Sequence, residues 1–280
     1  MKQIFIPFIV CFVATAAMAQ NKADIIVSYD SNVKDWQTDT TQTINMTLLA
    51  NAAEAKYFND ISLWTDSLKS TPEGKKQWQQ ILMAACMTQS PGGGISIDLT
   101  KGPVKKVSTY VFTSLADDRL RLYSEFANAP CYYDEPLSEM QWQTTDSSIT
   151  ILGYECVMAT TEYHGRKWTA WFTPEIPVPF GPWKLRGLPG LILKAEADNG
   201  RSIVASGIAN TQRIISPMYS ADTYQKTDRK KALAENEYFL NNCEAILKAE
   251  HGNSVRFEYN PADRPKYDAD RYADEPDYRQ

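Results

Sequence analysis

The chain of 280 residues offers few of the residue types that metal or nucleophile chemistry requires. Its two histidines, His164 and His251, lack a histidine or acidic partner at the spacing of a zinc-hydrolase helix. Cys156 lies in a run typical of a strand, where a packed thiol is the simpler interpretation. No Gly-x-Ser-x-Gly elbow occurs. The sequence therefore predicts no metal site, no cofactor and no complete catalytic set.

Paired carboxylates are the remaining route to catalysis. Glycoside hydrolysis needs only two carboxyl groups, one as acid and one as base or nucleophile. Asp134, Glu135 and Glu175 are candidates, although an acidic chain contains many such groups. A carboxylate-based hydrolase is therefore kept as an alternative.

A cationic and aromatic motif is more distinctive. It combines side chains suited to stacking on sugars or peptide side chains and to binding carboxylates. The candidate binding residues are Arg166, Trp171, Trp183, Lys184 and Arg186. The alternative is a corner of the core, in which the tryptophans pack and the cations extend outward to solvent.

Two hairpins are expected to position this motif. Residues 149–163 and 166–173 flank His164-Gly165, and a two-residue turn there places Tyr163 opposite Arg166. Residues 191–198 and 201–208 flank Asn199-Gly200, so the same kind of turn places Asp198 opposite Arg201. Aromatic residues on both faces of the first hairpin indicate that it is sandwiched or lines a cavity.

The connection between the hairpins is rich in proline and glycine. Four prolines between residues 174 and 182 exclude helix, so residues 173–183 are predicted to be extended and partly exposed to solvent. Pro189 and Gly190 occupy the central positions of a predicted type II turn. Gly187 is expected to allow a close backbone approach or an unusual φ.

Two helices and one irregular region complete the local predictions. Thr71 and Pro72 are typical of a helix start, and the apolar spacing predicts a helix through about residue 86. A second helix is predicted over residues 231–251, with Gly252 as its stop. Residues 128–148 are predicted to be mostly irregular.

The two ends of the chain differ from its middle. Residues 1–19 combine Lys2, a short apolar run and a small-x-small site, which is typical of a cleaved signal peptide. The run is shorter than the ~20 residues of a membrane span, so no span is expected after cleavage. Residues 20–260 are predicted to form a single antiparallel β-rich domain, and residues 261–280 a flexible charged tail.

The overall charge of the chain disfavours one class of binding partner. The formal net charge of −5 disfavours nucleic acid, whose partners normally carry a basic face. Because no second long apolar stretch follows the predicted signal peptide, we expect a soluble protein exported to the periplasm or the cell exterior.

The motif region carries a resemblance. The string GRKWTAWFTPEIPVPFGPWKLRGLPGLIL, together with GYECVMAT upstream, resembles the signature of the GLPGLI family of exported bacterial proteins. The chain also resembles the bowl-like N-terminal domain of a secreted bacterial N-glycanase, an accessory module without catalytic residues. That resemblance implies a curved, mostly antiparallel β structure, in keeping with the hairpins. Together with the helices predicted from the sequence, it gives a mainly β (α+β) fold, with a curved antiparallel sheet or half-barrel and two or three packed helices.

Three functions remain in view. The first is a non-catalytic binding module for a glycan, a peptide or an envelope protein, which predicts Trp171, Trp183 or Arg186 exposed in a groove. The second is a half-barrel carrier of lipid or another apolar ligand. The third is the carboxylate hydrolase.

Overall fold

The computed structural model describes residues 21–89, 95–97, 105, 107–137, 140–216, 223–252 and 265–280. The predicted signal peptide, residues 1–19, lies outside this range. None of the described helices has both the length and the apolar content needed to cross a bilayer.

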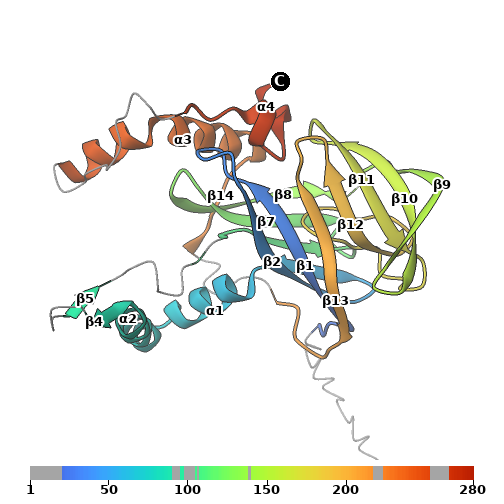
Figure 1. The fold of residues 1–280 in the computed structure, drawn as a ribbon, viewed down its shortest axis with the longest axis horizontal. Helices are drawn as coiled ribbons and strands as arrows, with labels where there is room; N and C mark the ends of the chain where they lie inside the picture. Colours follow the sequence, from blue (N-terminus) through green and yellow to red (C-terminus); the bar gives the residue numbers. More distant parts are fainter. Residues whose placement is uncertain are drawn as a thin grey trace, which may run out of the picture.

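The fold is a curved sheet of twelve strands with helices beside it (Figure 1), as the mainly β prediction expected. Its spatial order is β14-β8-β7-β6-β3-β2-β1-β13-β12-β11-β10-β9, and all neighbours are antiparallel except β14 and β8. The strands are β1 (Ile25–Lys34), β2 (Thr41–Ala50), β3 (Glu54–Phe58), β6 (Tyr110–Ser114), β7 (Arg119–Phe126), β8 (Ala129–Pro136), β9 (Gln143–Ile151), β10 (Tyr154–Tyr163), β11 (Arg166–Thr173), β12 (Leu191–Ala197), β13 (Ser202–Asn210) and β14 (Gln225–Lys226). A separate two-stranded sheet pairs β4 (Met87–Gln89) with β5 (Ile95–Ile97).

The first predicted hairpin has the expected register. β10 and β11 pair Tyr163 with Arg166, and the pairing continues to Val157 with Phe172. His164 and Gly165 have φ values of 51° and 80°, as a two-residue turn with both central residues left-handed requires. The local turn signal was therefore sufficient to set the register here.

The predicted register of the second hairpin was wrong by one residue. β12 and β13 pair Ala195 with Ile203, because the loop has three residues, Asp198 to Gly200. Only Gly200 has a positive φ, 85°, and the backbone N–H of Ala197 donates to the carbonyl of Arg201. This arrangement is typical of a three-residue loop that ends in a left-handed glycine.

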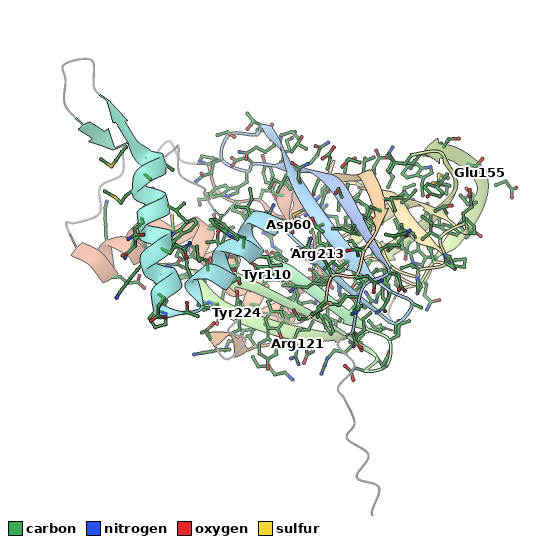
Figure 2. The ribbon with its side chains drawn as sticks, turned by 90° about the horizontal axis from the view of Figure 1, so that it is seen from below. Asp60, Tyr110, Arg121, Glu155, Arg213 and Tyr224 are labelled. Carbon is green, nitrogen blue, oxygen red and sulfur yellow. The ribbon has the colours of Figure 1, made fainter. Side chains whose placement is uncertain are left out.

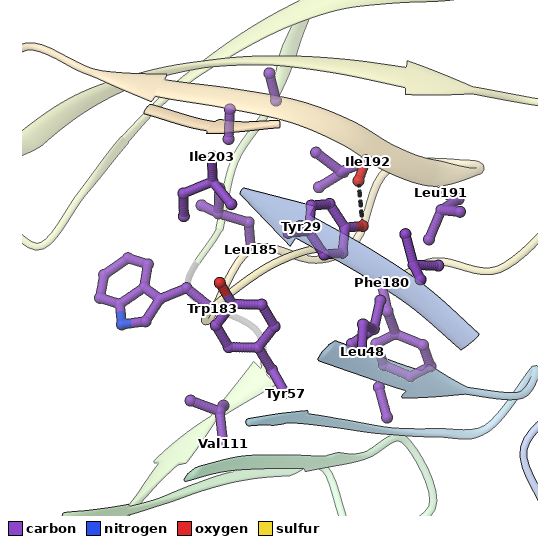
Figure 3. Close-up of a cluster of buried hydrophobic side chains, with 14 of the residues drawn as sticks. Tyr29, Leu48, Tyr57, Val111, Phe180, Trp183, Leu185, Leu191, Ile192 and Ile203 are labelled. Carbon is purple, nitrogen blue, oxygen red and sulfur yellow. Dashed lines mark hydrogen bonds between the residues drawn. The ribbon is translucent and has the colours of Figure 1, made fainter. Parts of the chain in front are cut away.

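The two faces of the sheet carry different cores. The larger cluster fills the inner face and includes Tyr29, whose hydroxyl donates to the carbonyl of Ile192 at 2.7 Å (Figure 3). A smaller cluster on the other face includes Phe58, Tyr110 and Tyr123. The alternation of strand side chains produces this division.

Four α-helices and one 3₁₀-helix are described outside the sheet. They are α1 (Asp60–Lys69), α2 (Pro72–Cys86), α3 (Arg229–His251), α4 (Ala269–Tyr272) and η6 (Pro276–Arg279). α2 begins as predicted, because the Thr71 hydroxyl accepts from the Gly74 N–H, and α3 ends at Gly252 as predicted. An ion pair of 3.1 Å between Arg213 and Asp60 connects α1 to the segment that follows β13 (Figure 2).

The region predicted to be mostly irregular, residues 128–148, contains β8 and the start of β9. Ala127 and Asn128 have φ values of 49° and 62° and form a tight turn from β7 into β8. The polar sequence of β8 hid the strand, whose Tyr133 and Glu135 face inward and are buried.

The predicted flexible tail is also corrected. Residues 265–280, called here the C-terminal segment, form α4 and η6 and pack beside α3 (Figure 1). Their charges are paired with the rest of the chain, which explains why a composition poor in aliphatic residues still has a defined position.

Candidate functional site

The connection between β11 and β12 crosses the inner face of the sheet. It is irregular and partly exposed, as expected, at Pro174, Glu175 and Pro177, but from Phe180 onward most of its side chains are buried, among them Leu185 and Leu188. Backbone hydrogen bonds hold it in place: Gly187 N–H donates to Pro179, and Ile192 N–H donates to Phe180. Figure 3 shows Phe180, Trp183 and Leu185 among the side chains of the strands.

The glycines of the motif are required for two different reasons. Gly187 has a φ of 86°, which confirms the expected unusual conformation. At Gly190 the reason is proximity, because a Cβ there would lie 2.1 Å from the carbonyl oxygen of Thr173. Its N–H donates to Leu188 across Pro189, whereas the Leu191 N–H donates to Ile176. The turn at Pro189 is therefore a three-residue γ-type turn rather than the predicted type II turn.

Trp183 is packed inside the core. Its side chain stacks on Trp168 with ring centroids 5.2 Å apart, and the residue is 7 % exposed. Its φ of 56° is left-handed, a conformation that costs a bulky residue about 1–2 kcal/mol. This backbone bend turns the next residue, Lys184, toward the inside of the curved sheet.

Lys184 lies at the centre of a buried group of charges. Its side chain is fully buried, and Nζ lies 2.5 Å from Glu135 Oε1 and 2.6 Å from Glu275 Oε1. It also donates to the Tyr133 hydroxyl at 3.1 Å. Glu135 comes from β8 and Glu275 from the C-terminal segment, so one ammonium group joins the sheet to the end of the chain.

His164, in the turn of the first hairpin, connects Glu135 to a third acid, Asp277 of the C-terminal segment. Its Nε2 lies 3.0 Å from Glu135 Oε2, and its Nδ1 lies 3.2 Å from Asp277 Oδ2. Arg229, at the start of α3, contacts Glu275 at 2.8 Å and Asp277 at 2.7 Å. We call Glu135, His164, Lys184, Arg229, Glu275 and Asp277 the charge cluster.

The charge cluster keeps Glu135 ionised. Burial by itself would raise the pKa of Glu135, but the charge of Lys184 and the hydrogen bond from His164 outweigh it, so the pKa lies well below its usual value. Tyr163 also donates to Glu135, at 2.8 Å. Burial and the neighbouring Glu275 and Glu135 raise the pKa of Tyr133 well above its usual value, so this phenol remains a neutral hydrogen-bonding group.

The other motif residues have different environments. Arg186 is 3 % exposed, and its guanidinium donates to the carbonyls of Lys184 and Pro136. Arg166 is 8 % exposed and donates to carbonyls of the C-terminal segment. Trp171 is half-buried on β11, with Lys194 Nζ 4.4 Å from its ring centroid.

These positions overturn the expectation that Trp183 or Arg186 would be exposed in a groove. The alternative of a core corner is correct for Trp183, although the cations Lys184 and Arg186 point inward rather than out to solvent. The proline-rich connection is folded onto the sheet by its own apolar side chains, which explains the difference. A binding role for the five motif residues stays a prediction.

The three candidate carboxylates of the hydrolase alternative do not converge. Asp134 faces away from Glu135, forms an ion pair of 2.6 Å with Arg121 and also contacts Lys226. Glu175 accepts from the Glu155 N–H at the far end of β10. Only Glu135 belongs to the charge cluster, where its carboxylate neighbours are Glu275 and Asp277.

The same cluster contains a geometry that resembles a metal site. One ligand atom from each of Glu135, His164 and Glu275 lies within 4.8 Å of the others. The ammonium group of Lys184, however, already lies between the two glutamates and neutralises them, in the place that a metal ion would occupy. The three side chains are therefore better explained as partners of Lys184 than as metal ligands.

Two openings adjoin the charge cluster. A cavity of about 190 Å³ lies between the sheet, α3 and the C-terminal segment, and Tyr133, Trp183 and Glu275 are among its lining residues. A more open pocket of about 660 Å³ is lined by residues that include Glu135, His164 and Arg229. The cluster is therefore close to solvent at its edges, although its central atoms are buried.

The sequence reasoning did not identify Glu275, Asp277, Arg229 or Tyr133 as site residues. The acidic residues were assigned to a flexible tail, and Arg229 lies just before the helix that was predicted over residues 231–251. The sequence feature that could have identified these residues is the C-terminal stretch itself, because tyrosines and acidic residues that alternate there can pair with the cations of the motif. Cys86, Cys131 and Cys156 are free thiols in the structure.

Comparisons with known proteins support the fold and part of the sequence resemblance. The model of a protein family of unknown function, Porph_ging, matches residues 160–194, a stretch that includes the hexapeptide Gly187–Ile192. No curated protein matches the chain. The solved structure titled "Structure of PNGF-II in C2 space group" is similar with a TM-score of 0.50 and 12 % identity, over 76 % of this chain and 32 % of that one.

A second structure, PNGF-II in the P21 space group, has a TM-score of 0.47 at 12 % identity over 76 % of this chain and 33 % of that one. The chain thus spans about a third of the length of PNGF-II. At this identity the likeness shows a shared fold, a large curved antiparallel sheet, and it assigns no activity to this chain.

Proposed function

We propose that this protein is an exported binding module that acts through contact with another molecule rather than through catalysis. Export rests on the signal-like residues 1–19. The binding role rests on one observation: the motif's buried cations are directed at carboxylates and carbonyl oxygens, which are the groups that a peptide presents.

The state of Glu135 supports binding over hydrolysis. A general acid that works near neutral pH needs a carboxyl group with a raised pKa. The pKa of Glu135 is instead held well below its usual value, and its oxygens already accept from Lys184, Tyr163 and His164. Among the candidates, a peptide with acidic side chains matches the cations better than a neutral glycan does.

The lipid-carrier alternative receives less support. The inner face of the sheet is filled by core residues such as Phe180, Leu185 and Leu191. The cavity of about 190 Å³ beside them is lined in part by Glu237, Asp274 and Glu275, which do not suit an acyl chain. Native mass spectrometry that found lipid bound to the purified chain would reverse this ranking.

The test is a parallel measurement of binding and turnover. The chain without residues 1–19 is screened on glycan and peptide arrays and against chromogenic glycosides and peptides. We expect saturable, salt-sensitive binding to acidic peptides and no turnover. Hydrolysis that disappears in Glu135→Gln, while the circular dichroism spectrum is unchanged, would show the carboxylate hydrolase to be correct.

A further inference from the structure

The C-terminal segment is held against the sheet mainly by charge. Of its described residues, only Ala269 and Glu275 are buried. The cavity of about 190 Å³ remains between the segment and the sheet, so the contact is not closely packed throughout. An interface of this kind depends on its ion pairs and hydrogen bonds more than on apolar area.

Four cations receive the segment, and we call Arg166, Lys184, Arg201 and Arg229 the cationic socket. Lys184 and Arg229 bind the carboxylate of Glu275, and Arg229 also binds Asp277. Arg201 pairs with Asp274. Each socket cation has a side chain that is no more than 15 % exposed, which strengthens its interactions relative to surface pairs.

Arg166 recognises the backbone rather than a carboxylate of the segment. Its guanidinium donates to the carbonyl oxygens of Asp270 at 2.6 Å, Ala273 at 2.8 Å and Ala269 at 3.1 Å. Asn199 donates to Ala273 as well, at 3.3 Å. These contacts do not depend on the side chains of the bound segment, so they suit any peptide that follows the same path.

The socket is strongly positive once the segment is set aside. Among the described residues outside the segment, two carboxylates would then remain in ion-pair distance of its four cations: Glu135 of β8 beside Lys184, and Asp198 in the β12–β13 loop, which lies 3.6 Å from Arg166. Four positive charges with low solvent exposure, balanced by only these negative charges, would favour the binding of an acidic ligand. The neighbouring pocket of about 660 Å³ brings solvent to the edge of this socket at Glu135, His164 and Arg229.

We propose that the cationic socket is a binding site for an acidic peptide of a partner protein, and that the C-terminal segment is the intramolecular occupant that this peptide replaces. The proposal rests on the proposed binding function and names its ligand class. The central recognised feature is two carboxylates two residues apart, as in Glu275-Pro276-Asp277, bound by Lys184 and Arg229. Arg201 binds the neighbouring carboxylate of Asp274, and Arg166 binds the backbone of the segment.

The test cuts the covalent link between the C-terminal segment and the rest of the chain, so that binding of the segment can be measured as an intermolecular reaction. A site-specific protease sequence is placed within residues 253–264, and the intact chain is compared with the cut chain. A fluorescent peptide of residues 265–280 is titrated into both, with fluorescence anisotropy as the readout. We expect saturable binding to the cut chain and at least tenfold weaker binding to the uncut chain, because the tethered segment competes at high effective concentration.

Matched variants identify the contacts. The peptide with Glu275→Gln and Asp277→Asn is expected to bind the cut chain at least tenfold more weakly than the native peptide. In the protein, Arg229→Gln is expected to weaken binding similarly. Lys226→Gln is the control, because Lys226 lines the adjacent pocket but pairs with Asp134. Equal affinities for the native and doubly substituted peptides would overturn the socket.

The partner is tested by competition. Peptides of unrelated sequence that keep a Glu-Pro-Asp core are expected to displace the fluorescent peptide, while their Gln-Pro-Asn counterparts are not. If only the chain's own sequence competes, the segment is a fixed part of the fold and the partner proposal is wrong. The uncut chain's binding on the arrays is a separate result, so the failure of the socket does not by itself decide the proposed function.

Discussion

Lys184 is the residue on which the site depends most. Its ammonium group is fully buried, and two carboxylates and a phenol surround it. Placing a charge in such a position costs several kcal/mol of desolvation, which only close and well-oriented partners offset. Removing one member of this group therefore leaves the others buried without adequate compensation.

Two lysine substitutions test this argument. Lys184→Met should lower the free energy of unfolding by about 3–5 kcal/mol, because Glu135 and Glu275 lose their shared partner. Lys194→Met removes an ion pair with Glu196 whose lysine side chain is 25 % exposed, and should cost no more than about 1 kcal/mol. Urea unfolding of both variants provides the measurement. Similar losses in the two variants would show that Lys184 contributes no more than a surface lysine.

The carboxylates of the cluster predict an acid dependence of stability. The folded-state pKa of Glu135 lies below its usual value of 4.5 because Lys184 and His164 outweigh the opposing effect of burial. As the pH falls below about 4.5, the unfolded chain therefore takes up the proton first, and folding stability is lost. The pKa of Asp277 is lowered as well, with Arg229 outweighing burial, and acts in the same direction.

Glu135→Gln should remove part of this dependence. We expect the variant to be less stable than the unsubstituted chain at pH 7, and the difference to shrink between pH 4.5 and pH 2. Chemical denaturation at a series of pH values measures how the free energy of unfolding of each protein changes with pH. The same pH dependence in both proteins would mean that the pKa of Glu135 is not lowered by folding.

At the scale of elements, the connection between β11 and β12 is positioned by one close backbone contact. Gly190 lies against the last residue of β11, and this contact directs the chain into β12. The resulting path places Trp183 and Lys184 over the inner face. The motif therefore acts on the fold chiefly through its backbone conformation.

A pair of glycine substitutions tests this role. Gly190→Ala would place a Cβ 2.1 Å from the Thr173 carbonyl oxygen, and the backbone shift should cost about 1–3 kcal/mol or more. Gly207→Ala in β13 meets nothing within 4 Å, so it should leave stability unchanged or raise it by up to about 1 kcal/mol. Thermal unfolding should separate the two variants clearly. A stable Gly190→Ala variant would show that the connection can move.

At the scale of the whole molecule, the two ends of the described chain are joined through charge. Arg271 of α4 binds Asp39, in the turn between β1 and β2, at 2.7 Å. The charge cluster joins β8, the β10–β11 turn, α3 and the C-terminal segment. The sheet is thus an apolar scaffold, and the segment beside it is retained by polar contacts.

Salt should therefore loosen the segment before the sheet. Raising NaCl from 0.05 to about 1 M shortens the screening length from more than 10 Å to about 3 Å, which weakens the partly exposed pairs of Arg271 and Arg201. Hydrogen exchange at residues 269–279 should accelerate, whereas β10 and β11 should remain protected. Unchanged exchange in the segment at high salt would show that its attachment is not electrostatic.

Local turn chemistry explains which parts of the fold could be predicted. His164-Gly165 set the β10–β11 register because both residues adopt left-handed φ, and the turn keeps this conformation although the His164 side chain also contacts Glu135 and Asp277. Asn199-Gly200 has an equally strong signal, but Asn199 donates to Ala273 of the C-terminal segment, and the loop has three residues. β8 was missed because its buried Glu135 looks like an exposed residue until Lys184 is placed beside it.

Local sequence was enough to establish the two antiparallel hairpins, helices α2 and α3, and the unusual φ of Gly187, because these depend on residues near one another in the chain. The three-dimensional fold was needed to show that Gly190 lies against Thr173, that the motif cations face inward and that the acidic C-terminal segment is their partner. Glu275 is 91 positions from Lys184, and no local pattern encodes the pairing of charges that meet only after the sheet has curved.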